Sequence, residues 1–277
     1  MRKSTKKRYW RRLLRYIFFL LLVFCLAYFL SGGTKLFSPH TWQAAGDFLP
    51  RLEQQPPAIA QSGQGTPPSA TDRLSRILFL KRAVNSRINA DTYVKLNDIP
   101  DSMQEAIVAV EDGRFYSHHG FDIEGIMRAS LVNMQYGSVE QGASTITQQL
   151  VKNLFLSNEQ SFGRKAEELL LALDMEANYS KDEILELYLN TIYYGSGAYG
   201  IGPASQEYFG KKPKELSLPE AAMLAGLPNA PSVYSPYNDF LLAKKRQIVV
   251  LDAMVHAGFI DESTAASAKI EPILLAH

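Results

Sequence analysis

Apolar residues recur at helical spacing along much of the chain. In residues 102–111, Met103, Ala106, Ile107 and Val110 follow the i, i+3, i+4, i+7 order that places side chains on one face of an α-helix. A Ser or Thr followed three residues later by Glu or Gln is the capping box that begins many helices. Four such pairs precede apolar-periodic runs and predict four helix starts: Ser102–Glu105, Thr145–Gln148, Ser180–Glu183 and Ser217–Glu220.

Strand patterns are weak by comparison. The best of them is TYVKL at 92–96. In the helix predicted from Ser217, Pro219 falls in the first turn, and Gly226 and Pro228 are expected to end it. We therefore predict a mainly α-helical protein.

The N-terminus shows a different pattern. Residues 16–30, YIFFLLLVFCLAYFL, are uncharged, and the next three residues lengthen the uncharged run to eighteen, about the lower limit for a membrane span. A cleaved signal peptide shares this pattern, but no A-x-A cleavage site follows, and aromatic residues lie near both ends as interface anchors do. We expect an uncleaved transmembrane anchor over 16–33, with the basic tail 1–15 in the cytoplasm and the rest outside it.

Composition divides the remaining chain. The formal charge of +1 conceals a basic tail: beyond residue 15 the chain carries 21 basic and 28 acidic residues, which argues against a nucleic-acid partner. A stretch rich in Pro, Gln, Ser and Ala indicates a spacer over 34–72, which leaves 73–277 as the folded domain. Cys25, the single cysteine, permits no intrachain disulfide.

The string EDGRFYSHHG at 111–120 holds the first candidate for chemistry. Four residues beyond Ile107, Glu111 continues the apolar stripe, so desolvation should raise its pKa toward the range of a general base. A frayed carboxylate in solvent is the alternative, but an acid at a helix C-terminus opposes the helix dipole. Asp112 is expected to point elsewhere.

Three further stretches carry weaker signals. In 142–156, Thr145, Gln148 and Lys152 share a polar helix face that suits an oxygen-rich ligand or simply solvent. In 164–176, Arg164 and Glu168 are spaced as a surface ion pair. The helix predicted at 181–190 ends in a loop rich in Tyr and Gly, and its apolar residues Ile184, Leu185, Tyr188 and Leu189 read as core.

Taken together, these strings resemble the signature blocks of the family-51 glycosyltransferases, the peptidoglycan glycosyltransferases. The resemblance covers roughly residues 90–256. Its blocks, in order, are EDGRFYSHHG (111–120), GASTITQQ (142–149), RKAEE (164–168), KDEILELYLN (181–190) and, more weakly, KKRQIVVLDAM (244–254).

The resemblance implies a reaction, a fold and a location. Such enzymes polymerise lipid II: the 4-hydroxyl of the acceptor N-acetylglucosamine attacks carbon 1 of the lipid-linked donor chain, the configuration inverts, and undecaprenyl diphosphate leaves. The implied fold is a lysozyme-like globular lobe with a smaller, membrane-associated jaw lobe, after one transmembrane helix. The implied location is the outer face of the bacterial cytoplasmic (inner) membrane, among membrane lipid and cell-wall synthesis or division proteins.

The resemblance also assigns roles to residues of this chain. Glu111 matches the base, and Glu168 matches a second essential carboxylate that orients cations or a divalent metal, Mg or Mn. Lys152, Arg164 and Lys165 would bind the diphosphate. His118 and Gly120 would shape the loop that holds the base. The remaining expected substrate contacts or supports are Asp112, Phe115, His118, Ser144, Thr145, Gln148, Gln149, Glu186, Tyr188, Asn190 and Arg246.

Several positions depart from the family pattern. Gln160 and Gln247 stand where Arg is frequent, and Gly202-Pro203 replaces an expected Glu-Ala type pair. No Lys-Thr-Gly occurs, and the only Ser-x-x-Lys is at 4–7, so we expect no transpeptidase and a monofunctional glycosyltransferase.

Three questions stay open at this level. The apolar residues Ile126, Met127, Leu131 and Met134 suit either a lipid-dipping jaw helix or core packing. A glycan-cleaving enzyme of lysozyme-like shape, with Glu111 as general acid, would share much of this pattern. A non-catalytic cell-wall scaffold would share it too.

Overall fold

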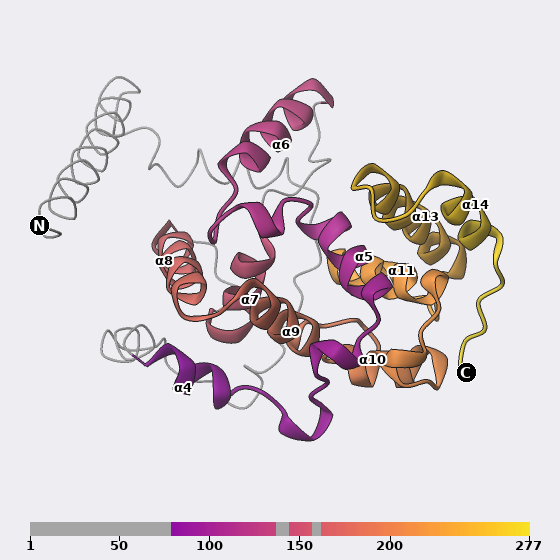
Figure 1. The fold of residues 1–277 in the computed structure, drawn as a ribbon, viewed down its shortest axis with the longest axis horizontal. Helices are drawn as coiled ribbons and strands as arrows, with labels where there is room; N and C mark the ends of the chain where they lie inside the picture. The colour runs from indigo at the N-terminus through magenta and orange to yellow at the C-terminus, as the bar shows by residue number, and fades with distance from the viewer. Residues whose placement is uncertain (1–78, 137–143, 157–161) are drawn as a thin grey trace, which may run out of the picture. The chain divides into compact units, whose positions relative to one another are not determined.

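The protein is mainly helical, as predicted. The computed structural model describes residues 79–136, 144–156 and 162–277 (Figure 1). Within these residues there is no strand, only an isolated bridge between Tyr193 and Tyr199. The α-helices are α4 (Leu80–Asn85), α5 (Asp101–Glu111), α6 (Ile123–Tyr136), α7 (Ile146–Phe155), α8 (Phe162–Asn178), α9 (Lys181–Thr191), α10 (Ile201–Phe209), α11 (Leu218–Gly226), α12 (Pro231–Tyr234), α13 (Phe240–His256) and α14 (Glu262–Ile270). Short 3-10 turns lie at Ala90–Thr92, Leu96–Asp98, Phe115–Ser117, Pro213–Glu215 and Leu227–Asn229.

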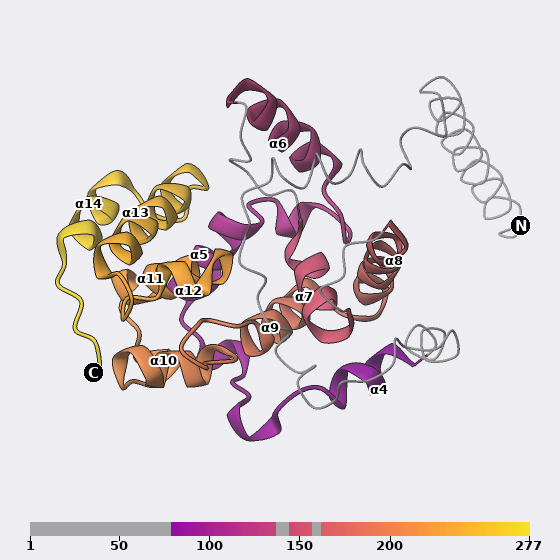
Figure 2. The same cartoon turned by 180° about the vertical axis from the view of Figure 1, so that it is seen from behind.

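Two groups of packed helices build the core around the end of α5. Helices α5, α11 and α13 lie side by side, and α7 packs on both α8 and α9 (Figures 1 and 2). Helix α11 is buried from Pro219 to Gly226 and forms the centre of the first group. A Cβ at Gly226 would lie 2.8 Å from Cγ of Arg246, so glycine allows α13 to approach closely.

Three of the four predicted helix starts are confirmed. Thr145 and Ser180 cap α7 and α9 with complete capping boxes, and Glu220 accepts the backbone N–H of Ser217 at 2.9 Å before α11. The fourth was placed two residues too late, because Ser102 was expected as the N-cap. Helix α5 begins at Asp101 with Pro100 at its N-cap, and Ser102 lies inside the helix.

The weak strand pattern at 92–96 does not form a strand. Thr92 ends one 3-10 turn, Leu96 begins the next, and the residues between them are irregular. Asn190 of α9 accepts the backbone N–H of Val94 and donates to its carbonyl, both at 2.8 Å. Side chains therefore satisfy the backbone groups that a neighbouring strand would otherwise bind.

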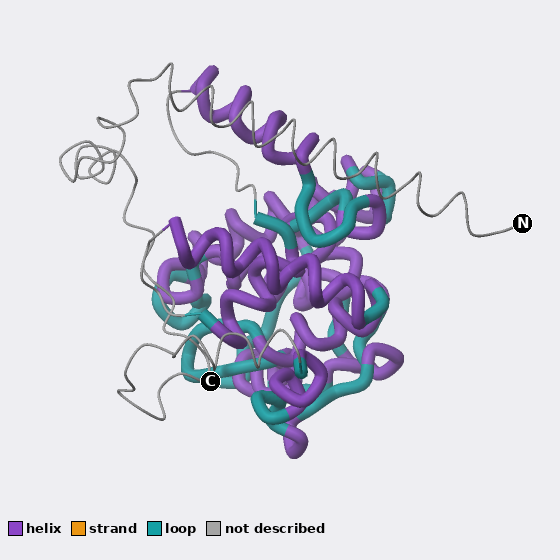
Figure 3. The backbone as a smooth tube through the Cα atoms, turned by 90° about the vertical axis from the view of Figure 1, so that its left-hand side faces the viewer, coloured by secondary structure: helices purple, strands orange, loops and turns teal. Residues whose placement is uncertain are grey.

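Helix α6 lies at the edge of the packed helices (Figure 3). Its Ile123, Ile126 and Met127 are 60%, 40% and 62% exposed, whereas Ala129 is buried. No described helix is both long and apolar enough to cross a bilayer. The predicted anchor at 16–33, the spacer at 34–72 and Gln160 lie outside the described residues.

Candidate active site

Glu111 is the last residue of α5 and is desolvated, as its place on the apolar stripe predicted. Its Oε2 accepts a hydrogen bond from Gln149 Nε2 at 2.7 Å. Its Oε1 is buried and has no hydrogen-bond partner among the described residues. Burial raises the pKa of Glu111 above the ordinary 4.5, and the charge of Asp112 raises it further, while the Gln149 bond and the charge of Arg246 act in the opposite direction. This is the environment of a general base that is available for protonation.

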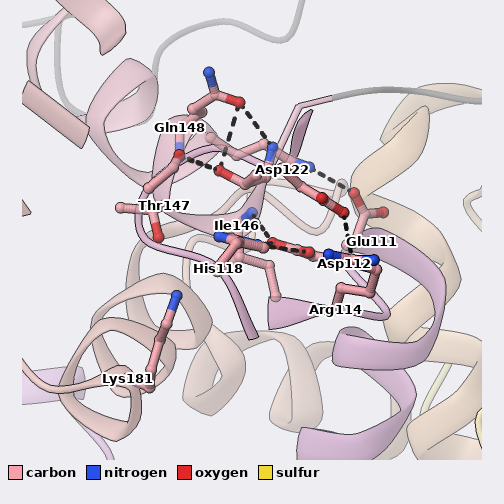
Figure 4. A network of polar contacts seen from close by, with 12 residues as sticks. Glu111, Asp112, Arg114, His118, Asp122, Ile146, Thr147, Gln148 and Lys181 are labelled. Carbon is pink, nitrogen blue, oxygen red and sulfur yellow. Dashed lines mark hydrogen bonds and ion pairs between the residues drawn. The ribbon is translucent and has the colours of Figure 1, made fainter. Parts of the chain in front are cut away.

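Asp112 points away from Glu111 and fixes two neighbouring segments. Its carboxylate oxygens lie 3.0 and 2.9 Å from Nε2 of His118, and Oδ2 also accepts the backbone N–H of Ile146 at 3.0 Å (Figure 4). Asp112 and His118 are only 8% and 7% exposed. Both were predicted as substrate contacts, but the contacts they make hold the loop after Glu111 against the first residue of α7. For His118 this agrees with the predicted loop-shaping role.

Phe115, another predicted substrate contact, is packed within the protein. Its ring is fully buried, makes an edge contact with Tyr116 at 5.1 Å, and lies under the ammonium of Lys181 at 4.4 Å from the ring centroid. Gly120, which completes the first block, adopts φ +82, and a Cβ there would meet the backbone oxygen of Ala172 at 3.1 Å. Glycine at this position therefore lets the loop lie on α8.

The polar residues at the start of α7 serve mainly to begin the helix. Thr145 accepts the backbone N–H of Gln148 at 3.2 Å and donates to the carbonyl of Gly120 at 2.8 Å. Gln148 in turn accepts the backbone N–H of Thr145 at 3.0 Å. Both side chains are buried and cap the helix, and their place in a donor groove stays a prediction. Ser144, just before the cap, is exposed and keeps its predicted role as a possible contact.

Gln149 is directed at the base. Besides donating to Glu111, it accepts a hydrogen bond from the hydroxyl of Tyr188 at 3.0 Å. Tyr188 is fully buried in α9, as its apolar spacing predicted, so it meets the site through Gln149. The buried hydroxyl of Tyr194 is a neighbour that the sequence did not single out: its pKa is raised by burial and by the charge of Glu111.

A group of charged side chains lies where α7 faces α8. Glu168 is 2% exposed, and its two oxygens accept from Arg164 at 2.9 Å and from Lys165. A simple surface pair is therefore excluded, because the carboxylate between the two cations is buried. Lys152 of α7 adjoins this group: burial lowers the pKa of its ammonium, the charges of Arg164 and Lys165 lower it further, and Glu168 opposes them. The predicted diphosphate-binding cations are thus brought together.

Glu186 and Asn190 stabilise the fold and do not contact the candidate site. Glu186 accepts the Tyr93 hydroxyl and the backbone N–H of Leu96, each at 2.7 Å. Asn190 binds the Val94 backbone, as described above. These contacts attach the irregular segment 93–96 to α9. Both side chains therefore have a supporting role.

On α13 the two neighbouring polar residues differ in role. Arg246 donates to the carbonyl of Gly226 at 3.3 Å, stacks over Tyr234 at 5.5 Å, and contributes positive charge near Glu111. Gln247 is fully buried and donates to the carbonyl of Pro219 at 2.7 Å. An Arg at that position would place a charge inside the α11–α13 interface of this chain.

The described residues lack a complete set of protein ligands for a divalent cation. The described residues contain no group of three or more His, Cys, Asp or Glu that could hold a metal ion. Both oxygens of Glu168 are occupied by cationic side chains. The described residues therefore do not fit a metal held by protein ligands.

Comparisons with known proteins show the family to which the chain belongs. Residues 80–255 match the family described as Transglycosylase. The chain is 48% identical over 181 residues to penicillin-binding protein 1A of Vibrio cholerae and 51% identical over 168 residues to that of Neisseria flavescens. These matches cover 65% and 61% of this chain but only 22% and 21% of the relatives, so the chain matches about a fifth of their length. A solved structure, penicillin-binding protein 1A from Haemophilus influenzae, is 27% identical over 66% of this chain and 18% of its own, with a TM-score of 0.39, too low to establish a shared fold.

Proposed function

The chain belongs to the transglycosylase family, and from this premise we propose that it is a peptidoglycan glycosyltransferase that polymerises lipid II into glycan strands. The observation that carries the proposal is a desolvated carboxylate, Glu111, that contacts the same helix, α7, that carries the cation Lys152. Gln149 contacts Glu111, and Lys152 follows one turn later, about 4.5 Å further along the helix axis. A base and an anion-binding group that adjoin one helix suit transfer between a hydroxyl and a diphosphate.

The base acts on the acceptor. Glu111, when ionised, takes the proton from the 4-hydroxyl of the acceptor N-acetylglucosamine as that oxygen attacks carbon 1 of the donor's N-acetylmuramic acid. The new bond forms on the face opposite the departing oxygen, so the configuration inverts from α to β. We assign the proton to Oε1, which has no described protein partner, because Gln149 already donates to Oε2.

The cations act on the leaving group. Negative charge develops on undecaprenyl diphosphate as the bond to carbon 1 breaks, and fixed positive charge nearby lowers the energy of that state. Lys152, Arg164 and Lys165 supply this charge, and buried Glu168 holds the last two in place. Because an Arg guanidinium and a Lys ammonium flank Glu168, the group offers both a planar fork and a point charge to phosphate oxygens.

Membrane attachment and the finer architecture belong to the same proposal. The substrate is a lipid, and the exposed Ile123, Ile126 and Met127 of α6 form an apolar face suited to contact with the bilayer surface. We assign α6 to a jaw lobe beside a lysozyme-like lobe, and 16–33 to a single-pass anchor in the cytoplasmic membrane. Strong amide-exchange protection of α6 in detergent without substrate would contradict this assignment.

Partners and cofactors follow from the substrate. Lipid II, the lipid-linked glycan chain and membrane lipid are the proposed partners, together with cell-wall synthesis or division proteins. A divalent cation would need oxygens from the diphosphate itself, since Mg²⁺ commonly binds between substrate phosphates and one or two carboxylates.

The test compares two substrates with the full-length protein in detergent. Labelled lipid II is expected to become glycan polymer with release of undecaprenyl diphosphate. Labelled glycan polymer, supplied separately, is expected to remain intact. Shortened glycan would establish the hydrolase instead, and binding of lipid II without conversion would establish the scaffold.

A further inference from the structure

Three side chains from three helices form a chain of hydrogen bonds that ends at the base. The Tyr188 hydroxyl of α9 donates to Oε1 of Gln149 at 3.0 Å. Nε2 of Gln149, on α7, donates to Oε2 of Glu111 at 2.7 Å. Because Tyr188 is fully buried, its contact with the amide is protected from water.

The orientation of the Gln149 amide depends on Tyr188. A Gln side chain has an accepting oxygen at one end and a donating nitrogen at the other, and only the nitrogen favours an ionised carboxylate. If the amide were reversed, its oxygen would face Glu111, and the Tyr188 hydroxyl would have to accept from the nitrogen. No other described side chain accepts from that hydroxyl, so its proton would be buried without a partner.

We propose that Tyr188 is a positioning residue that fixes the amide of Gln149 with its N–H toward Glu111 and so sets the pH at which the base ionises. The proposal rests on the proposed function, in which ionised Glu111 accepts the proton of the acceptor hydroxyl. Tyr188 touches neither substrate nor Glu111 in this role and acts only through Gln149.

The other charged and titratable groups around Glu111 do not duplicate this role. Asp112 follows it on α5 and raises its pKa, Arg246 on α13 lowers it, and Tyr194 lies in the loop after α9. On α11, which also packs on α5, the single charged residue is Glu220, and Lys211 pairs with it at 2.6 Å. Only the Gln149 hydrogen bond would change from lowering to raising the pKa of Glu111 if its amide turned over.

The first experiment measures the pH profile of lipid II polymerisation by the full-length Tyr188→Phe variant. Loss of the hydroxyl frees the amide to reverse, so the acid limb of kcat/KM is expected to move up by about one pH unit, with the rate recovered at higher pH. Tyr208→Phe is the matched control. Tyr208 is also fully buried, but its hydroxyl binds the Tyr194 carbonyl and Ser196 and not Gln149, so its acid limb should stay where the wild type's lies.

A second variant tests the route of the effect. Gln149→Met removes the amide and should raise the acid limb by itself. In that background, Tyr188→Phe is expected to add no further shift, because the two residues act through one bond. An additive shift in the double variant would show that Tyr188 acts on Glu111 by another path and would overturn the proposal.

A readout without turnover separates this inference from the proposed function. Infrared difference spectra against Glu111→Gln isolate the carboxyl signal of Glu111, and its titration gives the pKa directly. If no polymer forms with the wild type, the proposed function fails, while a higher Glu111 pKa in Tyr188→Phe still supports the relay. An unchanged pKa in both Tyr188→Phe and Gln149→Met overturns the relay, whatever the polymerisation assay shows.

Discussion

Replacing Asp112 by Asn should weaken both the fold and the alignment of the site. The Asp112 carboxylate is 8% exposed and accepts from two donors, His118 Nε2 and the backbone N–H of Ile146. An Asn oxygen can keep the bond to Ile146. Its NH2 group then faces His118, and the pair is restored only if the imidazole carries its proton on Nδ1, which is buried and has no described partner.

The expected cost follows from these bonds. A hydrogen bond to a charged group contributes about 1.5–3 kcal/mol, and a buried donor without a partner costs about 1–3 kcal/mol. Because the Ile146 bond survives in neutral form, we expect the free energy of unfolding to fall by about 3 kcal/mol. At about 2–4 °C per kcal/mol for a domain of this size, Tm should fall by roughly 6–12 °C. The rate should fall as well, because Gln149 lies one turn beyond Ile146 on α7.

The assay is thermal and denaturant unfolding of the full-length protein in detergent, with lipid II polymerisation measured on the same preparations. Asp101→Asn is the matched control. This exposed acid lies at the opposite end of α5, where loss of its charge near the helix N-terminus should cost less than about 1 kcal/mol. If Asp112→Asn unfolds within about 0.5 kcal/mol of the wild type, a change typical of a surface substitution, the positioning role assigned to Asp112 is wrong.

Three further outcomes are expected. The polymerisation rate should fall as pH drops through the pKa of Glu111. Since burial raises that pKa above 4.5, the fall should begin at higher pH than for an exposed glutamate. A rate that stays flat through that pH range would refute the role of Glu111 as the base. Glu168→Gln should lower kcat/KM for lipid II by about a hundredfold, because Arg164 and Lys165 lose their buried partner. An unchanged kcat/KM would exclude these two cations from the leaving-group site. Gly200→Ala should cost about 1–3 kcal/mol of stability or more, because φ is +85 and the new Cβ would lie 2.6 Å from the backbone oxygen of Asn190. Gly197→Ala, at φ +78 with open space around it, should cost less, and equal melting temperatures of the two variants would contradict the steric argument.

Local sequence signals predicted the helices because the interactions that begin them are local. The capping boxes at Thr145 and Ser180 join residues three apart, so the pattern and the hydrogen bonds coincide. The start of α5 was misplaced because Pro100, with its fixed φ, takes the N-cap and no side chain caps the helix. The segment 92–96 could not be predicted, because Asn190, which binds its backbone, lies far away in sequence.

The candidate site was predicted unevenly for a related reason. Glu111 could be found from its place on the stripe, since burial of a helix face follows from periodicity. The sequence could not separate side chains that face a ligand from those that close the structure. Asp112, His118 and Gln148 have the chemistry of substrate contacts, and only their tertiary partners show that they fix the loop and the helix start. The same holds for Tyr188, whose buried hydroxyl meets Gln149.

Replacement of Glu111 tests most directly whether it acts as the base of a lipid II polymerase. Polymer formed from labelled lipid II should be compared for the full-length wild type, Glu111→Gln and Glu105→Gln. Glu105 is the matched control because it lies on the same helix and burial also raises its pKa. Polymer is expected from the wild type and Glu105→Gln and none from Glu111→Gln, although that variant should still bind lipid II. Polymer from Glu111→Gln at the wild-type rate would contradict the role of Glu111 as the base.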